Sequence, residues 1–334
     1  MLEYIFIPIS SFILTFLFTP LARKIAFVAN VFDNPSNDLK VHKKPIPYLG
    51  GIALVLGILI ALVIANHQFS FIRTYFLGLL TASIIITSLG LLDDLFDIKQ
   101  TYKFFVQIIL AIGLVSIGFR VETFPAPYIA IPLTIFYITG GCNALNLLDG
   151  LDGLAAGISA ISSLFFFVLF LDNNNIMGIA ISLSLLGSCV AFLVFNFNPA
   201  SIFMGDAGSM FLGMMLSVLM IHYSDTPFEY KFFLIPILIC GVPIFDTALT
   251  YTRRYINKKP VFPGDRSHFY DQLIDRGFSV RKTVLISYCI GIFFGIVALI
   301  MYKVSDVKAA LIFLSVLFTL IIVVRKMNML KMNE

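Results

Sequence analysis

Long apolar stretches recur along the whole chain, separated by shorter segments in which charged and amide side chains collect. A helix needs about 20 predominantly apolar residues to cross the hydrocarbon core of a bilayer. Most of the stretches reach or approach that length, so they predict membrane-spanning helices. We expect about eleven spans, at residues 4–22, 49–66, 71–92, 103–120, 127–147, 154–171, 176–195, 207–223, 231–251, 283–302 and 307–324.

Composition agrees with this pattern. Of the 334 residues, 59% are hydrophobic and 13% are charged, and the mean hydropathy is +0.96. A soluble globular chain carries about 25% charged residues. The sequence therefore predicts an all-α polytopic membrane protein, with a single integral-membrane domain over residues 1–334 and no polar region long enough for a soluble domain.

Charge and cysteine usage exclude two other classes of protein. The net charge of +4 is spread over the loops, which argues against a nucleic-acid partner. The four cysteines stand alone, without the CxxC or Cys/His spacing of a zinc site. We interpret Cys142, Cys189, Cys240 and Cys289 as buried thiols without a disulfide or metal partner.

The distribution of Lys and Arg sets the expected orientation, because cytoplasmic loops carry an excess of these residues. With the N-terminus outside, 18 of the 23 Lys and Arg residues fall on the cytoplasmic side. Arg23 and Lys24 follow the first apolar stretch, whereas a secretory signal has its basic residues in front. We therefore expect an N-out, C-in topology with a retained first span.

Four polar segments interrupt the apolar pattern. They are DDLFD at 93–97, GGCNALNLLDGLDGLAAG at 140–157, NFNPASIFMGDAG at 196–208 and RRYINKKPVFPGDRSH at 253–268. Ionisable residues at a membrane segment are costly, so such clusters indicate a functional site. In the expected topology all four segments face the cytoplasm, which predicts a single wet cleft there.

The residue types in these segments are suited to phosphate chemistry. Asp93, Asp94, Asp149, Asp152 and Asp206 repel one another in one cleft unless a cation is bound, and oxygen ligands alone favour Mg²⁺ or Mn²⁺ over zinc. Acids, a metal and Lys or Arg side chains on one face are what phosphoryl transfer requires. The basic residues expected on this face are Lys43, Lys44, Lys103, Arg254, Arg266 and His268.

Together with PIPYLGG at 45–51, the four segments resemble those of the polyprenyl-phosphate N-acetylhexosamine-1-phosphate transferases, in the same order along residues 40–270. That superfamily includes the phospho-N-acetylmuramoyl-pentapeptide translocase of peptidoglycan synthesis. It also includes the undecaprenyl-phosphate N-acetylglucosamine-1-phosphate transferases of O-antigen and teichoic acid synthesis. The resemblance implies an enzyme of the inner (plasma) membrane that takes a UDP-amino sugar and a polyprenyl phosphate, needs Mg²⁺ (or Mn²⁺), and releases UMP. Whether the enzyme forms a homodimer stays an open question.

The resemblance also implies a role for each matched residue. The residues implied to take part in catalysis are Asp93, Asp94, Asp152 and His268. The implied metal ligands are Asp206 and Asp94. The implied substrate-binding residues are Lys43, Lys44, Lys103, Asn146, Asp149, Asn196, Phe203 and Arg266. Direct displacement and a covalent phospho-aspartyl intermediate both remain open.

The chain departs from the family pattern at one place. Both well-known subfamilies have clustered histidines in the last cytoplasmic loop, whereas here His268 is followed by Phe269, Tyr270 and Asp271. This departure argues against a muramoyl-pentapeptide donor and is more similar to transferases that start O-antigen or capsule chains on modified amino sugars, such as N-acetylfucosamine.

Several residues also have a plain structural interpretation. Asn143 is as well suited to a hydrogen bond between helices as to a substrate contact. Lys258 and Lys259 are best explained by the positive-inside rule. Among other functions, an ion-coupled transporter is the main alternative, but it would place its charges near the midplane and contain repeats. A purely structural membrane scaffold does not require acidic and basic side chains on one side of the membrane, so this pattern argues against that function.

Overall fold

The computed structural model describes residues 2–33, 45–224, 226–259 and 268–330 and is almost entirely helical. Within those ranges, nine helices are long and apolar enough to cross a membrane. They are α1 (Phe6–Val28), α2 (Gly50–Phe69), α3 (Arg73–Phe96), α5 (Pro127–Leu148), α6 (Leu154–Asp172), α7 (Ile176–Asn196), α8 (Gly205–Tyr223), α12 (Val280–Tyr302) and α13 (Asp306–Lys326). These helices confirm the prediction of an all-α polytopic membrane protein. A helix satisfies its own backbone N–H and C=O groups, as a lipid-facing segment requires.

Two of the predicted spans differ from the structure. The span predicted at 231–251 is broken into α9 (Lys231–Ile239) and α10 (Gly241–Ile256), which meet at 81°. Pro243 explains the break, because it has no N–H to donate to the carbonyl four residues earlier. The span predicted at 103–120 is the shorter α4 (Gln100–Ser116), whose chain turns away at Gly118, where φ is +103°.

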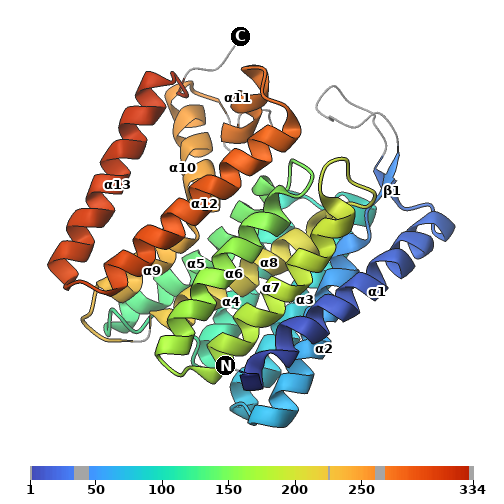
Figure 1. Cartoon of the computed structure of the whole chain (residues 1–334), viewed down its shortest axis with the longest axis horizontal. Coiled ribbons are helices and arrows are strands. Elements are labelled where there is room, and N and C mark those ends of the chain that lie inside the picture. Colours follow the sequence, from blue (N-terminus) through green and yellow to red (C-terminus); the bar gives the residue numbers. More distant parts are fainter. Residues whose placement is uncertain (1, 34–44, 225, 260–267, 331–334) are drawn as a thin grey trace.

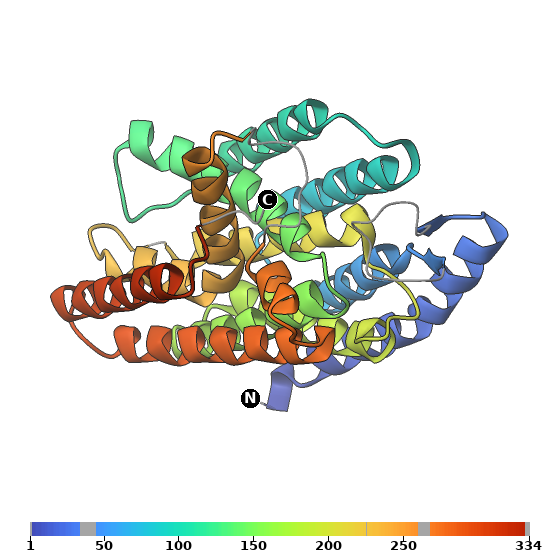
Figure 2. The same ribbon diagram turned by 90° about the horizontal axis from the view of Figure 1, so that it is seen from above.

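Helix α8 lies at the centre of the molecule and is buried along nearly its whole length. Figures 1 and 2 place α1 and α13 at opposite edges, and both expose most of their apolar residues. This gradient is what a membrane protein requires, because outer helix faces contact lipid while the central helix contacts protein. The start of α8, at Gly205 and Asp206, is therefore held on several sides.

The short elements lie at the two ends of the bundle. A 3₁₀ turn, η1 (Leu2–Tyr4), precedes α1. At the opposite end, β1 (Phe32–Asp33) pairs antiparallel with β2 (Ile46–Pro47), and α11 (Phe269–Asp275) follows the segment after α10. The backbone N–H of Phe203 donates to the carbonyl of Pro47, so β2 also holds the loop between α7 and α8.

Candidate active site

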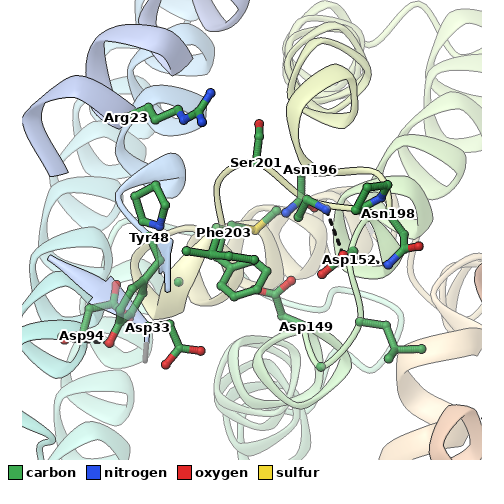
Figure 3. A pocket seen from close by; sticks show the side chains of 18 of the residues that line it. Arg23, Asp33, Tyr48, Asp94, Asp149, Asp152, Asn196, Asn198, Ser201 and Phe203 are labelled. Atoms are coloured by element: carbon green, nitrogen blue, oxygen red, sulfur yellow. Dashed lines mark hydrogen bonds between the residues drawn. The ribbon is translucent and has the colours of Figure 1, made fainter. Parts of the chain in front are cut away.

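A cavity of about 800 Å³ opens where α1, α3, α5 and α7 end and where α2, α8 and α12 begin. Its described lining includes five carboxylates, Asp33, Asp94, Asp149, Asp152 and Asp206, and one arginine, Arg23. Figure 3 shows the labelled acids and Phe203 around one space, with Arg23 on the opposite side from Asp149. The predicted convergence is thus confirmed for the polar segments at 93–97, 140–157 and 196–208. Residues 260–267 of the fourth segment lie outside the described residues.

Asp94 fastens the end of α3 to the start of α8. Its Oδ1 accepts a hydrogen bond from the backbone N–H of Asp206 at 2.8 Å, and its Oδ2 accepts one from Ala207 at 3.3 Å. A carboxylate at a helix N-terminus satisfies N–H groups that have no partner within the helix and complements the helix dipole. Gly205 has φ +72°, and a Cβ there would lie 2.6 Å from Asp94 Oδ2, so this turn requires glycine.

Lys103 of α4 forms a bridge between two acids. Its Nζ lies 2.5 Å from Asp93 Oδ2 and 2.9 Å from Asp206 Oδ2, and the residue is only 7% exposed. The N–H of Ile98 donates to the other oxygen of Asp93 at 2.8 Å. A buried ion pair of this kind is costly to break on one side only, so Lys103 fixes Asp206 at the cavity edge.

Asp152 and Asn196 shape the loop between α7 and α8. Asp152 Oδ2 accepts hydrogen bonds from Asn198 Nδ2 and from the N–H of Ala200, both at 2.9 Å. Asn196 accepts from the N–H of Gly153 and donates to the carbonyl of Ile202. Both residues line the cavity, and both hold the loop that carries Phe203.

Acidic side chains crowd together on the cavity wall. Burial, followed by the charges of Asp206, Asp94 and Asp152, raises the pKa of Asp149 well above its usual range. Burial and the neighbouring acids, Asp94 first, raise the pKa of Tyr48 to about 12. Both shifts have the sign expected where carboxylates crowd together in a partly dry space. A bound cation would relieve this repulsion.

The residues fit a divalent cation that is completed by substrate. No group of three or more His, Cys, Asp and Glu side chains in the described ranges forms a ready-made metal cage. Mg²⁺ does not need one, because it is usually held by one or two carboxylates plus water and substrate phosphates. Asp206 and Asp94 line the same cavity, and Asp149 stands nearby as a further oxygen donor.

His268 lies beside the cavity and not on its described lining. Its Nδ1 is 2.6 Å from Oδ2 of Asp246, a fully buried acid of α10. Asn146 lines the cavity and donates to Ser209 of α8. Lys43, Lys44 and Arg266 lie outside the described residues.

The sequence analysis did not predict some of the residues at this site. Arg23, Asp33, Tyr48 and Ser201 line the cavity. Tyr48 and Ser201 stand in segments that we had matched to the family, but neither was singled out, and Arg23 and Asp33 stand outside those segments. Arg23 was assigned to topology alone, and Asp246 was overlooked inside an apparently continuous span. Asn143 connects α4 to α5, because it accepts from Gln100 and donates to Gln107. The interhelical interpretation of Asn143 is therefore the one that the contacts support.

Comparisons with known proteins bear on the same elements. The sequence model of glycosyl transferase family 4 matches residues 76–224, from α3 to the end of α8. A Bacillus subtilis (strain 168) protein named "probable undecaprenyl-phosphate N-acetylglucosaminyl 1-phosphate transferase" is 38% identical over 328 residues, which cover 95% of this chain and 88% of that protein.

Two further relatives come from other bacteria. The decaprenyl-phosphate N-acetylglucosaminephosphotransferase of Mycobacterium leprae is 32% identical, over 77% of this chain and 73% of its own. The undecaprenyl-phosphate α-N-acetylglucosaminyl 1-phosphate transferase of Thermotoga maritima is 30% identical, over 87% of each. From the matched segments, the carboxylate-lined cavity and these relatives, the chain belongs to glycosyl transferase family 4.

Proposed function

We propose that the chain transfers an amino sugar 1-phosphate, of the N-acetylhexosamine type, from a UDP-sugar to a polyprenyl phosphate. The observation that supports this most strongly is the meeting of Asp94, Asp149 and Asp206 in one cavity at the end of a membrane bundle. The named relatives act on undecaprenyl or decaprenyl phosphate, which fits an acceptor held in the bilayer. The product would be the first lipid-linked intermediate of a cell-envelope polysaccharide.

The reaction balances as a phosphoryl transfer. An oxygen of the polyprenyl phosphate attacks the β-phosphorus of the UDP-sugar and forms a new P–O bond. The bond from that phosphorus to the bridging oxygen breaks, and UMP leaves with its electron pair. Catalysis of such a step depends mainly on positioning and on neutralising charge.

The position of each residue suggests its role in binding the metal, in holding Asp206 in place or in stacking on the base. Asp206, with Asp94 or Asp149 beside it, would hold Mg²⁺ (or Mn²⁺), which when bound neutralises charge on the donor diphosphate. Lys103 keeps Asp206 in place, and Asp93 is paired with the same ammonium group. Phe203 presents an aromatic ring inside the cavity, on which a uracil base can stack, a contact worth about 1–3 kcal/mol in single-strand binders.

The finer assignments are part of the same proposal. The strong excess of Lys and Arg on one side favours a cavity that faces the cytoplasm, with the N-terminus outside. N-acetylglucosamine is the first sugar to test, because the relatives are named for it. O-antigen or other lipopolysaccharide chains are one destination of such a product. The transporter alternative is dropped, because the relatives are transferases and the acids gather at one end of the bundle.

The test is UMP release by the purified full chain in detergent, with undecaprenyl phosphate and a panel of UDP-N-acetylhexosamines. We expect release with at least one donor, stopped by EDTA and restored by excess Mg²⁺, and absent when the lipid is omitted. UMP release that does not depend on lipid would indicate a hydrolase. No release with any donor would contradict the proposal.

A further inference from the structure

One turn supplies a continuous part of the cavity wall. Residues 149–152 all line the cavity, and they connect the end of α5 to the start of α6 at Gly153. We call this connection the 149–153 turn. Within it, Asp152 accepts the backbone N–H of Ala200 at 2.9 Å, in the loop that carries Phe203 (Figure 3). The position of the turn therefore also sets the position of the wall that carries the aromatic ring.

Both ends of the 149–153 turn are held by a tyrosine hydroxyl from the C-terminal helices. Before the turn, the hydroxyl of Tyr270 in α11 donates to the carbonyl of Leu147 at 2.9 Å. After it, the hydroxyl of Tyr288 in α12 donates to the carbonyl of Gly153 at 2.6 Å. Carbonyls in the last turn of a helix have no partner within that helix, so the first contact also completes the end of α5.

The two tyrosine rings lie tightly against glycines next to these carbonyls. A Cβ at Gly150 would be 2.2 Å from the hydroxyl oxygen of Tyr270, and a Cβ at Gly157 of α6 would be 2.0 Å from that of Tyr288. Tyr270 is only 4% exposed, and Tyr288 is half-buried. Close packing of this kind leaves each hydroxyl little freedom to move, so the turn is fixed at both ends.

We propose that Tyr270 and Tyr288 are positioning residues for the donor nucleotide, because they hold the 149–153 turn in place against the loop that carries Phe203. This inference rests on the proposed function. When the walls of a site are fixed before binding, no binding energy is lost in ordering them. Without either hydroxyl, the nucleotide itself would have to order the turn, and its affinity would fall.

Tyr270→Phe and Tyr288→Phe test this, since each removes one hydroxyl and keeps the ring. We expect each variant to raise KM for the UDP-sugar by about threefold to tenfold, the scale of one hydrogen bond between uncharged groups. Binding that is lost equally from the ground state and the transition state raises KM alone, so kcat should change by less than about twofold. KM for undecaprenyl phosphate should stay as in the wild type.

The competing explanation is that the two hydroxyls only stabilise the fold. Fewer molecules would then be active, so kcat and the melting temperature would fall while KM for the UDP-sugar stayed unchanged. Tyr302→Phe is the matched control, because the hydroxyl of Tyr302 also donates from α12, to the carboxylate of Asp172 at the other end of the helix. The control should match the wild type in both KM values. An unchanged KM for the UDP-sugar in both Tyr270→Phe and Tyr288→Phe would overturn the inference.

A second readout needs no turnover. Calorimetric titration of the purified full chain with UDP, in detergent and Mg²⁺, gives a Kd that should rise in Tyr270→Phe and Tyr288→Phe by the same factor as KM. The Kd of Tyr302→Phe should equal that of the wild type. An unchanged Kd in the first two variants would overturn the role of the tyrosines. A wild-type chain that binds UDP but turns over no donor would contradict the proposed function instead, and the Kd values would still decide the inference.

Discussion

Single side chains at this site have both a structural contact and a chemical role. Asp94 accepts two N–H groups at the start of α8, and Asp206 shares the ammonium group of Lys103 with Asp93. Such carboxylates are pre-positioned, so little reorganisation is needed when charge develops on a substrate. We therefore expect the charge of Asp206 to matter most.

We expect Asp206→Asn to lower kcat by at least about 10²-fold, the scale seen when one pre-organised electrostatic group is removed. Asparagine keeps the shape and one acceptor oxygen, and Asp93 still pairs with Lys103, so the variant should insert and melt much like the wild type. UMP release and a melting curve on the same preparation measure both effects. Lys258→Ala, in the exposed turn after α10, is the control and should retain activity. Near wild-type turnover in Asp206→Asn would remove the metal assignment.

Residue types in short segments were sufficient to find Asp94, Asp149, Asp152, Asn196, Phe203 and Asp206, all of which line the cavity. They were not sufficient for Arg23 or Asp33, because a single polar residue at a helix end or in a loop looks the same whether it faces solvent or a cavity. Asp246 was missed for a different reason. It stands in an apolar stretch, and only the bend after Ile239 turns it toward His268.

At the scale of helices, close approach to α8 decides where Asp206 lies. A Cβ at Gly90 of α3 would meet the backbone N of Ala207 at 2.4 Å, a distance that real contacts do not reach. Gly113 of α4 is also inside a helix, but a Cβ there would meet nothing within 4 Å. The two glycines therefore form a matched pair for substitution.

Gly90→Ala should destabilise the protein by about 1–3 kcal/mol, the usual cost of overpacking, and should lower turnover because the start of α8 is displaced. Gly113→Ala should be neutral or stabilising, by up to about 1 kcal/mol, since alanine is the better helix former. Thermal unfolding can be followed with a thiol-reactive dye, because Cys142, Cys189 and Cys240 are buried. Cys289 is exposed, so the expectation of a buried thiol was wrong there, and its reaction with the dye gives the starting signal. Equal melting temperatures for the two variants would show that the α3–α8 contact is not tight.

Most of the membrane-spanning helices could be predicted from the sequence. An apolar stretch long enough to cross a bilayer has few backbone structures open to it other than a helix. The break between α9 and α10 was not, since hydropathy averages over Pro236, Gly241 and Pro243 and sees one apolar segment. The break has consequences for the site. It produces α10, a helix with an apolar face and a buried polar face that includes Asp246, Arg253 and Arg254.

In the whole molecule, segments more than fifty residues apart share one cavity because alternate helices end at the same side. Asp94, Asp149 and Asp206 come from three such places. The order of segments predicted this convergence, whereas the distances between side chains depend on packing around α8. The group that we expect to be transferred in this cavity is a sugar 1-phosphate and not the sugar alone.

The most direct test follows the β-phosphorus of the donor. Purified protein is incubated with undecaprenyl phosphate, Mg²⁺ and UDP-N-acetylglucosamine, or another active donor, labelled with ³²P at the β position. The lipid is then extracted. We predict that the label enters the lipid extract while unlabelled UMP appears in the aqueous phase. Label that stays in water as UDP, with the sugar alone on the lipid, would contradict the account.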